Sequence, residues 1–257
     1  MFDRINEGRY WDFGWDLVSG CTRVSEGCMS CWFLSMRKRF SKEIGIVFHL
    51  ERIMRPFKRR KPASYAIWGD LFHESVTFDQ IDQVFDTIMF NLHHIFYILT
   101  KRPERMLEYF NSGRKWMLIT KEFPLPNVLI GTTVENQKYA NIRIPILLKI
   151  PAKIRFISCE PLLGQVDLKN IQQFNSEGKY IASYQVLEPI LNCGDSNRPA
   201  LDLIICGPET GTKARPMQKE WIELLYSQCK AANVPFFDKK NILGLNIKQL
   251  PNVKNEL

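Results

Sequence analysis

The sequence predicts an α/β protein built on a partial or full (β/α) barrel of six to seven parallel strands. Short, almost continuous apolar runs alternate with segments of helical periodicity, and this alternation is typical of parallel strands covered on both faces. A chain of 257 residues with 45% hydrophobic composition can also bury a core of that size in one domain. A doubly wound open sheet fits the same alternation and is the alternative.

The expected elements follow one another along the chain in a regular order. A first strand is expected within residues 8–20, which are rich in aromatic residues and glycine. Helical spacing is expected over 32–40, 104–110, 137–149 and 219–232, and Thr77 opens a capping box for a helix that runs through Asn91. The remaining strands are expected at residues 64–68, 95–99, 128–134, 154–159, 201–206 and 234–237.

We expect one barrel-like domain over residues 1–240, with a cysteine loop at 19–32, an insertion at 169–200 and a C-terminal tail at 241–257. The insertion is rich in turn residues and contains one strand-like run at 180–186, which suggests a small hairpin or lid over the barrel. No apolar run approaches the ~18 residues of a membrane span, and the first residues lack an apolar leader. We therefore expect a cytoplasmic protein.

Every expected strand after the first is followed by a polar or charged residue. In both candidate architectures ligands bind at the carboxyl ends of the strands, so these residues are candidates for a site. Strand ends are also polar simply because loops are solvated, and roughly half of the set is expected to have no further role. The residues are Asp70, Lys101, Glu135, Glu160, Glu209 and Asp238.

Three of the seven cysteines, Cys21, Cys28 and Cys31, form a C-x6-C-x2-C pattern after the first expected strand. Three thiolates on one loop leave a coordination position open, as a reactive centre requires. The spacing favours a 4Fe-4S cluster over zinc, and a redox C-x2-C pair would leave Cys21 without a role. A zinc site would need a fourth ligand, for which the candidates are His73, His93 and His94. The single cysteines Cys159, Cys206 and Cys229 lie in apolar runs and are expected in the core.

Six blocks of the sequence carry a resemblance to a known family. They are residues 18–31, 69–74, 99–106, 131–137, 157–164 and 207–211 with 214–217, in this order. The chain resembles a family of phage and bacterial proteins of uncertain function, which is marked by a three-cysteine motif and described as related to radical S-adenosylmethionine enzymes.

The resemblance implies a partial barrel with a 4Fe-4S cluster on Cys21, Cys28 and Cys31. It also implies reductive cleavage of bound S-adenosylmethionine to a 5'-deoxyadenosyl radical, with electrons from an external reductant. Two features depart from the common radical-enzyme pattern. The first cysteine gap is six residues instead of three, and the Gly-Gly-Glu block expected after the second strand has only Gly69-Asp70 there, with a similar Gly207-Pro208-Glu209 much later.

Several charged residues are assigned to this cofactor and its substrate. A carboxylate can pair with the ammonium group of S-adenosylmethionine, and an amide can bond ribose hydroxyls. Arginine and lysine can hold a carboxylate or phosphate of the substrate, although a salt bridge with a neighbouring glutamate is an equal alternative. The cofactor candidates are Asp70, Glu135, Asn136, Glu160 and Glu209, and the substrate candidates are Lys101, Arg102 and Arg215.

The net charge is +8, and much of the positive charge is concentrated in residues 37–61. Such a stretch could contact phosphates or could be a solvated surface. The leading hypothesis is therefore a radical S-adenosylmethionine-type enzyme that acts on a nucleic acid or nucleotide. The alternatives are a metal-stabilised module that binds nucleic acid or protein without catalysis, and a degenerate barrel that has lost its cluster.

Overall fold

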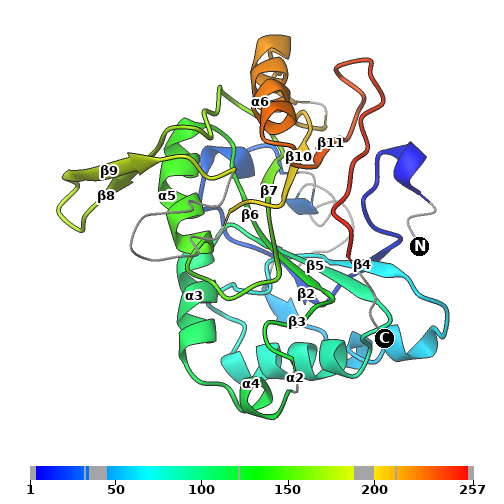
Figure 1. Cartoon of the computed structure of the whole chain (residues 1–257). Coiled ribbons are helices and arrows are strands. Elements are labelled where there is room, and N and C mark those ends of the chain that lie inside the picture. The colour runs from blue at the N-terminus through cyan, green and yellow to red at the C-terminus, as the bar shows by residue number, and fades with distance from the viewer. Residues whose placement is uncertain are drawn as a thin grey trace.

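The computed structural model describes residues 4–31, 33–34, 45–120, 122–187, 200–211 and 213–253. Seven parallel strands form a curled sheet that makes a half-barrel, in the order β1-β4-β5-β6-β7-β10-β11 (Figure 1). This confirms the prediction of a partial (β/α) barrel. The strands are β1 (Phe13–Trp15), β4 (Ser64–Ile67), β5 (Ile95–Thr100), β6 (Val128–Thr133), β7 (Ile154–Cys159), β10 (Leu203–Cys206) and β11 (Phe236–Asp238).

The α-helices connect these strands, as the sequence pattern predicts. Thr77 caps the first of them, because its hydroxyl accepts from the Gln80 amide while the Gln80 side chain accepts from the Thr77 amide. The helix expected over 32–40 falls almost entirely outside the described residues. The α-helices with bounds among the described residues are α2 (Phe78–Met89), α3 (Pro103–Asn111), α4 (Lys115–Ile119), α5 (Gln137–Leu147) and α6 (Lys219–Ala231).

Successive residues of a strand point to opposite faces of the sheet. Both faces are apolar because neighbouring residues within each strand are apolar. Ile98 and Ile130 belong to a core between the convex face and the helices. Their neighbours Tyr97 and Leu129 belong to a second core on the concave face. N-terminal and C-terminal residues, including Trp11 and Leu250, pack against this second core, and in Figure 1 the two ends of the chain run along the same side of the half-barrel.

Two small antiparallel sheets flank the half-barrel. β2 (Val18–Ser19) leads into the cysteine loop and pairs with β3 (Val47–Phe48), which comes after the loop in the chain. The loop therefore follows a strand that is outside the main sheet. β8 (Ile171–Phe174) and β9 (Tyr180–Tyr184) form a hairpin within the expected insertion, and it projects from the body in Figure 1. Among the described helices, none is long and apolar enough to cross a bilayer.

Two adjacent histidines hold the loop before β4 against the start of β5. The buried His94 accepts from the Ala63 amide through Nδ1 at 3.2 Å and donates from Nε2 to the Pro56 carbonyl at 3.1 Å. His93 Nε2 lies 3.2 Å from the Arg59 carbonyl oxygen. The loop includes the short 3-10 helix η4 (Pro56–Lys58), and η3 (Leu50–Arg52) precedes it.

We predict that this arrangement makes stability fall in mild acid. Burial lowers the pKa of His94, and the charges of His93 and Arg59 lower it further. The hydrogen bonds to the backbone carbonyls of Pro56 and Arg59 raise this pKa, but they do not offset the lowering. The unfolded chain then binds the proton more readily below pH ~6.5, so the free energy of unfolding falls as the pH drops through that value. His94→Phe should lose about 2 kcal/mol at pH 7.5, because Ala63 N and Pro56 O lose their partner.

The test is urea denaturation at pH 7.5, 6.5 and 5.5. The variant should show a flatter pH dependence than the wild type, and equal slopes would contradict the prediction. His73, whose pKa is also lowered by burial, contributes in the same direction in both proteins. For that reason the informative quantity is the difference between the two slopes.

Candidate functional site

The loop that carries the three cysteines runs along the carboxyl ends of the strands. Gly20 begins it with φ 81°, a left-handed conformation that favours glycine. The loop then forms the short helix η2 (Glu26–Cys28). A Cβ atom on Gly27 would lie 2.6 Å from Oε1 of Glu135, so only glycine allows the loop to approach the sheet this closely.

Glu135 is the fully buried carboxylate beneath this loop. It accepts from Arg143 Nη1 at 2.7 Å and from Lys101 Nζ at 3.0 Å, and it also accepts a short hydrogen bond from Ser25 of the loop. Lys101 Nζ in turn lies 3.5 Å from Cys28 Sγ. Two cations therefore share one carboxylate, and the excess positive charge lies next to Cys28.

Arg102 makes the corresponding connection to Cys21. Its Nη1 donates to Asp70 Oδ2 at 2.6 Å and lies 3.8 Å from Cys21 Sγ. Its Nη2 donates to Thr22 Oγ1 at 2.6 Å, and Nε donates to Glu74 Oε1 at 3.0 Å. All three nitrogens have protein partners and the side chain is buried, so Arg102 positions the loop in this structure rather than presenting a free guanidinium to a substrate.

The thiols of Cys21 and Cys28 have different pKa values because their surroundings differ. Burial raises the pKa of the Cys21 thiol to about 11, with Asp70 adding to the shift and Arg102 opposing it. Burial also acts to raise the pKa of Cys28, but the charge of Lys101 and hydrogen bonds within the loop lower it overall. The thiol of Cys28 therefore ionises at lower pH than that of Cys21.

A third contact fastens the loop to the segment after β10. Arg215 forms a forked ion pair with Glu209, through Nη2 to Oε1 at 2.6 Å and Nε to Oε2 at 3.0 Å. These bonds lower the pKa of Glu209. Arg215 Nη2 also donates to the Glu26 carbonyl at 2.9 Å. Asn136 caps α5 and makes a short hydrogen bond to the Glu26 side chain.

Glu160, which follows β7, forms a separate pair with Lys239 at 2.5 Å. Lys239 follows β11, and its ammonium group lies 5.2 Å from the centre of the Trp11 ring. Sequence reasoning did not select Lys239, although the run Asp238-Lys239-Lys240 marks the end of that strand. Asp238 itself is buried and accepts from the Leu243 amide, so it supports the tail.

The structure brings the predicted carboxylates and cations together at one rim, mostly as ion pairs with each other. Besides Lys239, the partners that the sequence did not indicate are Ser25, Thr22, Glu74 and Arg143. His73 lies at this rim, where Nε2 is 2.9 Å from Thr22 Oγ1. His93 and His94 lie at the amino end of β5, away from the cysteines, so their suggestion as zinc ligands was wrong.

The donor set at the rim fits a sulfur-ligated metal or cluster. Three thiols lie on one loop, and N–H groups of Lys101 and Arg102 face two of them, which would offset negative charge on coordinated sulfur. Within the described residues, no three His, Cys, Asp or Glu side chains are spaced to hold a metal ion. The residue types therefore suit such a group, while their spacing in this structure does not enclose one.

Comparison with known proteins gives a family. The family model described as a protein of unknown function (DUF5131) matches residues 6–244. The chain belongs to the DUF5131 family. No curated protein and no solved structure matches the chain. In this DUF5131 protein the matched region includes the cysteine loop, all of its partners at the rim, and Lys239.

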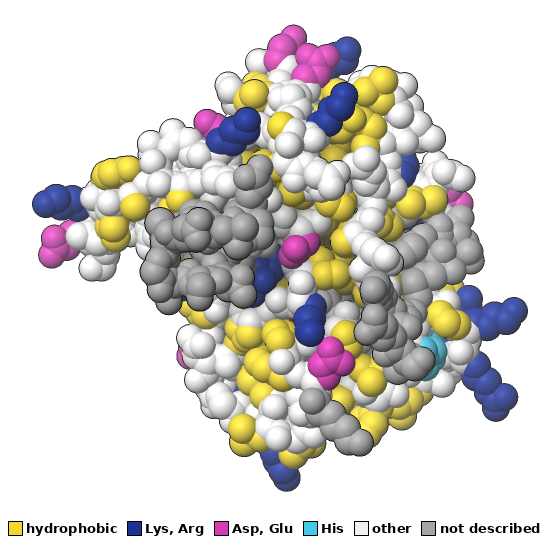
Figure 2. All heavy atoms as spheres, in the orientation of Figure 1, with side chains coloured by type: hydrophobic (Ala, Val, Ile, Leu, Met, Phe, Trp, Pro, Cys, Tyr) yellow, Lys and Arg dark blue, Asp and Glu magenta, His cyan; other side chains and the backbone are white. Residues whose placement is uncertain are grey.

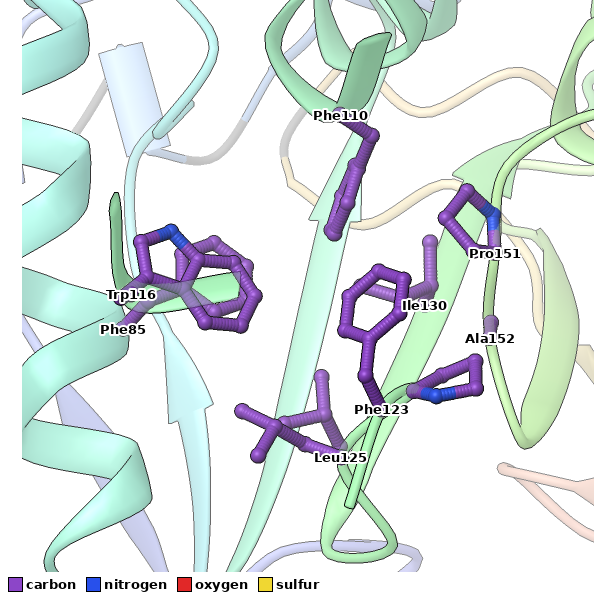
Figure 3. A pocket seen from close by; sticks show the side chains of 10 residues that line it. Phe85, Phe110, Trp116, Phe123, Leu125, Ile130, Pro151 and Ala152 are labelled. Atoms are coloured by element: carbon purple, nitrogen blue, oxygen red, sulfur yellow. The ribbon is translucent and has the colours of Figure 1, made fainter. Parts of the chain in front are cut away.

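An apolar pocket also exists, but it has a different character. Figure 3 shows Phe85 and Trp116 overlapping on one side of it, with Phe110 and Phe123 lining the other. Its lining comes from aromatic, aliphatic and proline residues of α2, α3, α4, β6 and the loops around 123–125 and 151–152. The indole N–H of Trp116 donates to Tyr109, and the other residues that line the pocket in this DUF5131 protein are apolar.

Proposed function

We propose that the chain is a radical S-adenosylmethionine-type enzyme whose cysteine loop carries a 4Fe-4S cluster on Cys21, Cys28 and Cys31. The observation that carries the proposal is the attachment of this loop to the carboxyl ends of a parallel half-barrel, with protein cations facing two of its sulfurs. The six sequence blocks that resemble the three-cysteine-motif proteins support it as well.

Bound there, the cluster would supply an electron for cleavage of S-adenosylmethionine. The chain's own residues would do three things. Lys101 and Arg102 donate hydrogen bonds toward the sulfurs of Cys28 and Cys21, which makes electron uptake at the loop more favourable. Glu135 fixes Lys101 at that position. Glu160 and Glu209 each have one cation partner, so an incoming ammonium group can compete for them.

The proposal is tested by anaerobic reconstitution with iron and sulfide. The wild type should gain the brown iron–sulfur chromophore and release 5'-deoxyadenosine from S-adenosylmethionine under reduction. Cys28→Ala should lose both signals, whereas Cys229→Ala, a buried cysteine in α6, should keep them. Absence of the chromophore, or a chromophore without 5'-deoxyadenosine, would refute the enzymatic function.

A second candidate is a metal-stabilised binding module without catalysis. It is favoured by the pairing of the rim charges, since Asp70, Glu135, Glu160 and Glu209 are all neutralised by cations of the chain itself. Of the three histidines considered as a fourth zinc ligand, only His73 is at the rim. This function predicts stoichiometric zinc in protein purified without oxygen, and loss of that zinc in His73→Ala.

The substrate class that best fits the positive charge of the chain is nucleic acid or a nucleotide, with an external reductant as the second partner. A polyanion would be attracted by the net charge of +8.

A further inference from the structure

The basic stretch at residues 37–61 divides into two parts with different roles. Residues 37–39 lie outside the described residues. Arg52 and Arg55 pair with Asp16, at 2.6 and 3.2 Å. Arg59 lies over the Phe13 ring at 4.8 Å. These three arginines have partners around β1, although the side chains of Arg52 and Arg55 are 36% and 46% exposed.

Lys58, Arg60 and Lys61 are different. All three are exposed, and none has a carboxylate within ion-pair distance in the part of the chain that the structure describes. In Figure 2 Lys and Arg side chains project from the right-hand edge, where Figure 1 places the loop between η4 and β4. Elsewhere on that face basic side chains are scattered and often stand beside acidic ones. Phe57, next to these cations, is 42% exposed.

The backbone of this loop is fixed although its cationic side chains are free. His94 holds it at Pro56 and at Ala63, and His93 lies within hydrogen-bond distance of the Arg59 carbonyl between them. The three free cations are thus presented from a rigid support, which lowers the entropy that a partner must remove on binding.

The loop lies at the amino ends of β4 and β5, opposite the cysteine loop. β5 contains six residues, and at a rise of ~3.3 Å per residue the two ends of the sheet are about 20 Å apart. A mononucleotide cannot reach from one end to the other. A nucleic acid strand of about six nucleotides or more can, at ~3.4 Å per nucleotide.

We propose that Lys58, Arg60 and Lys61 form a docking site for the phosphate backbone of a nucleic acid, remote from the cysteine rim, with Phe57 available to stack on a base. This deepens the proposed function by selecting a polymer over a mononucleotide as the partner. Docking itself does not depend on the cluster, so the two can fail separately. Leu50 and Met54, which are close in sequence and exposed, would also suit an anionic lipid surface. The experiment below therefore compares nucleic acid with anionic lipid vesicles as the partner.

The experiment is fluorescence anisotropy with 20-nucleotide single-stranded DNA and RNA over a range of salt concentrations. The probe variant is K58Q/R60Q/K61Q, and the matched control is K138Q/K179Q/K230Q, which removes three exposed lysines elsewhere. Three phosphate contacts to a single strand should contribute about −2 to the slope of log K against log salt. The probe variant should therefore lose that amount of slope and bind at least about tenfold more weakly, while the control stays within twofold of the wild type.

Equal binding by the probe variant and the wild type would overturn the proposal. So would wild-type protein that binds vesicles containing phosphatidylserine but neither nucleic acid. Release of 5'-deoxyadenosine, measured on the same variants without nucleic acid, should be unchanged, which separates this result from failure of the proposed function. Matching thermal unfolding curves establish that the variants are folded.

Discussion

Glu135→Ala is expected to lower the free energy of unfolding by about 3–5 kcal/mol, because it leaves two cations at the rim without their shared carboxylate. Arg143 is buried, and Lys101 is largely buried. Ser25 loses its acceptor as well, so the cysteine loop should detach more easily. Urea denaturation measures the stability, and the rate at which Cys28 reacts with a thiol reagent measures the loop; we expect this rate to rise.

The matched control is Glu74→Ala. Glu74 also pairs with a buried arginine, but its own side chain is 65% exposed, so the loss should stay below about 1 kcal/mol. A double variant, Glu135→Met with Arg143→Met, should recover part of the loss, because no charge is then left unpaired between those two positions. A single-variant loss no larger than that of Glu74→Ala would show that the buried pairs do not hold the rim together.

Arg102→Ala should have an effect of similar size, about 3–5 kcal/mol, since Asp70 would remain buried without its cation and Thr22 would lose its donor. Arg102→Lys should recover only part of this, because one ammonium group cannot replace three nitrogens in a fixed fork. Circular dichroism melting gives the stability, and thiol reactivity of Cys21 gives the position of the loop.

The corresponding comparison is Arg215→Ala, which removes the contact to the loop at the Glu26 carbonyl. Arg215 is 38% exposed, whereas the side chain of its partner Glu209 is only 4% exposed. Its removal should therefore cost about 1–3 kcal/mol, less than Arg102→Ala, because water already reaches this ion pair from the arginine side. If Arg102→Lys proved as stable as the wild type, the fork of contacts to Asp70, Thr22 and Glu74 would not be the reason for the position of Arg102. If Arg215→Ala cost as much as Arg102→Ala, burial would not be what distinguishes them.

Much of the site could be predicted from sequence because it depends on strand ends. Parallel strands deliver their carboxyl ends to one edge, so Lys101, Glu135 and Glu160 had to lie along the same edge once their strands were recognised. Their pairing could not be predicted in the same way. Arg143 reaches Glu135 from the middle of a helix, and Lys239 reaches Glu160 from the last strand of the sheet. These contacts depend on the curvature and register of the sheet, which no local pattern encodes.

The sequence by itself determined the parallel α/β architecture, the capped helix at Thr77 and the loop of three cysteines, because hydrophobic periodicity and residue spacing are local properties of the chain. Only the tertiary structure decided that the barrel is half-open, that Arg102 serves the loop, and that the free cations lie at the other end of the sheet from the cysteines. The physical reason is that a charge acts on whatever the fold places within a few ångströms of it, and neighbours in space are seldom neighbours in sequence.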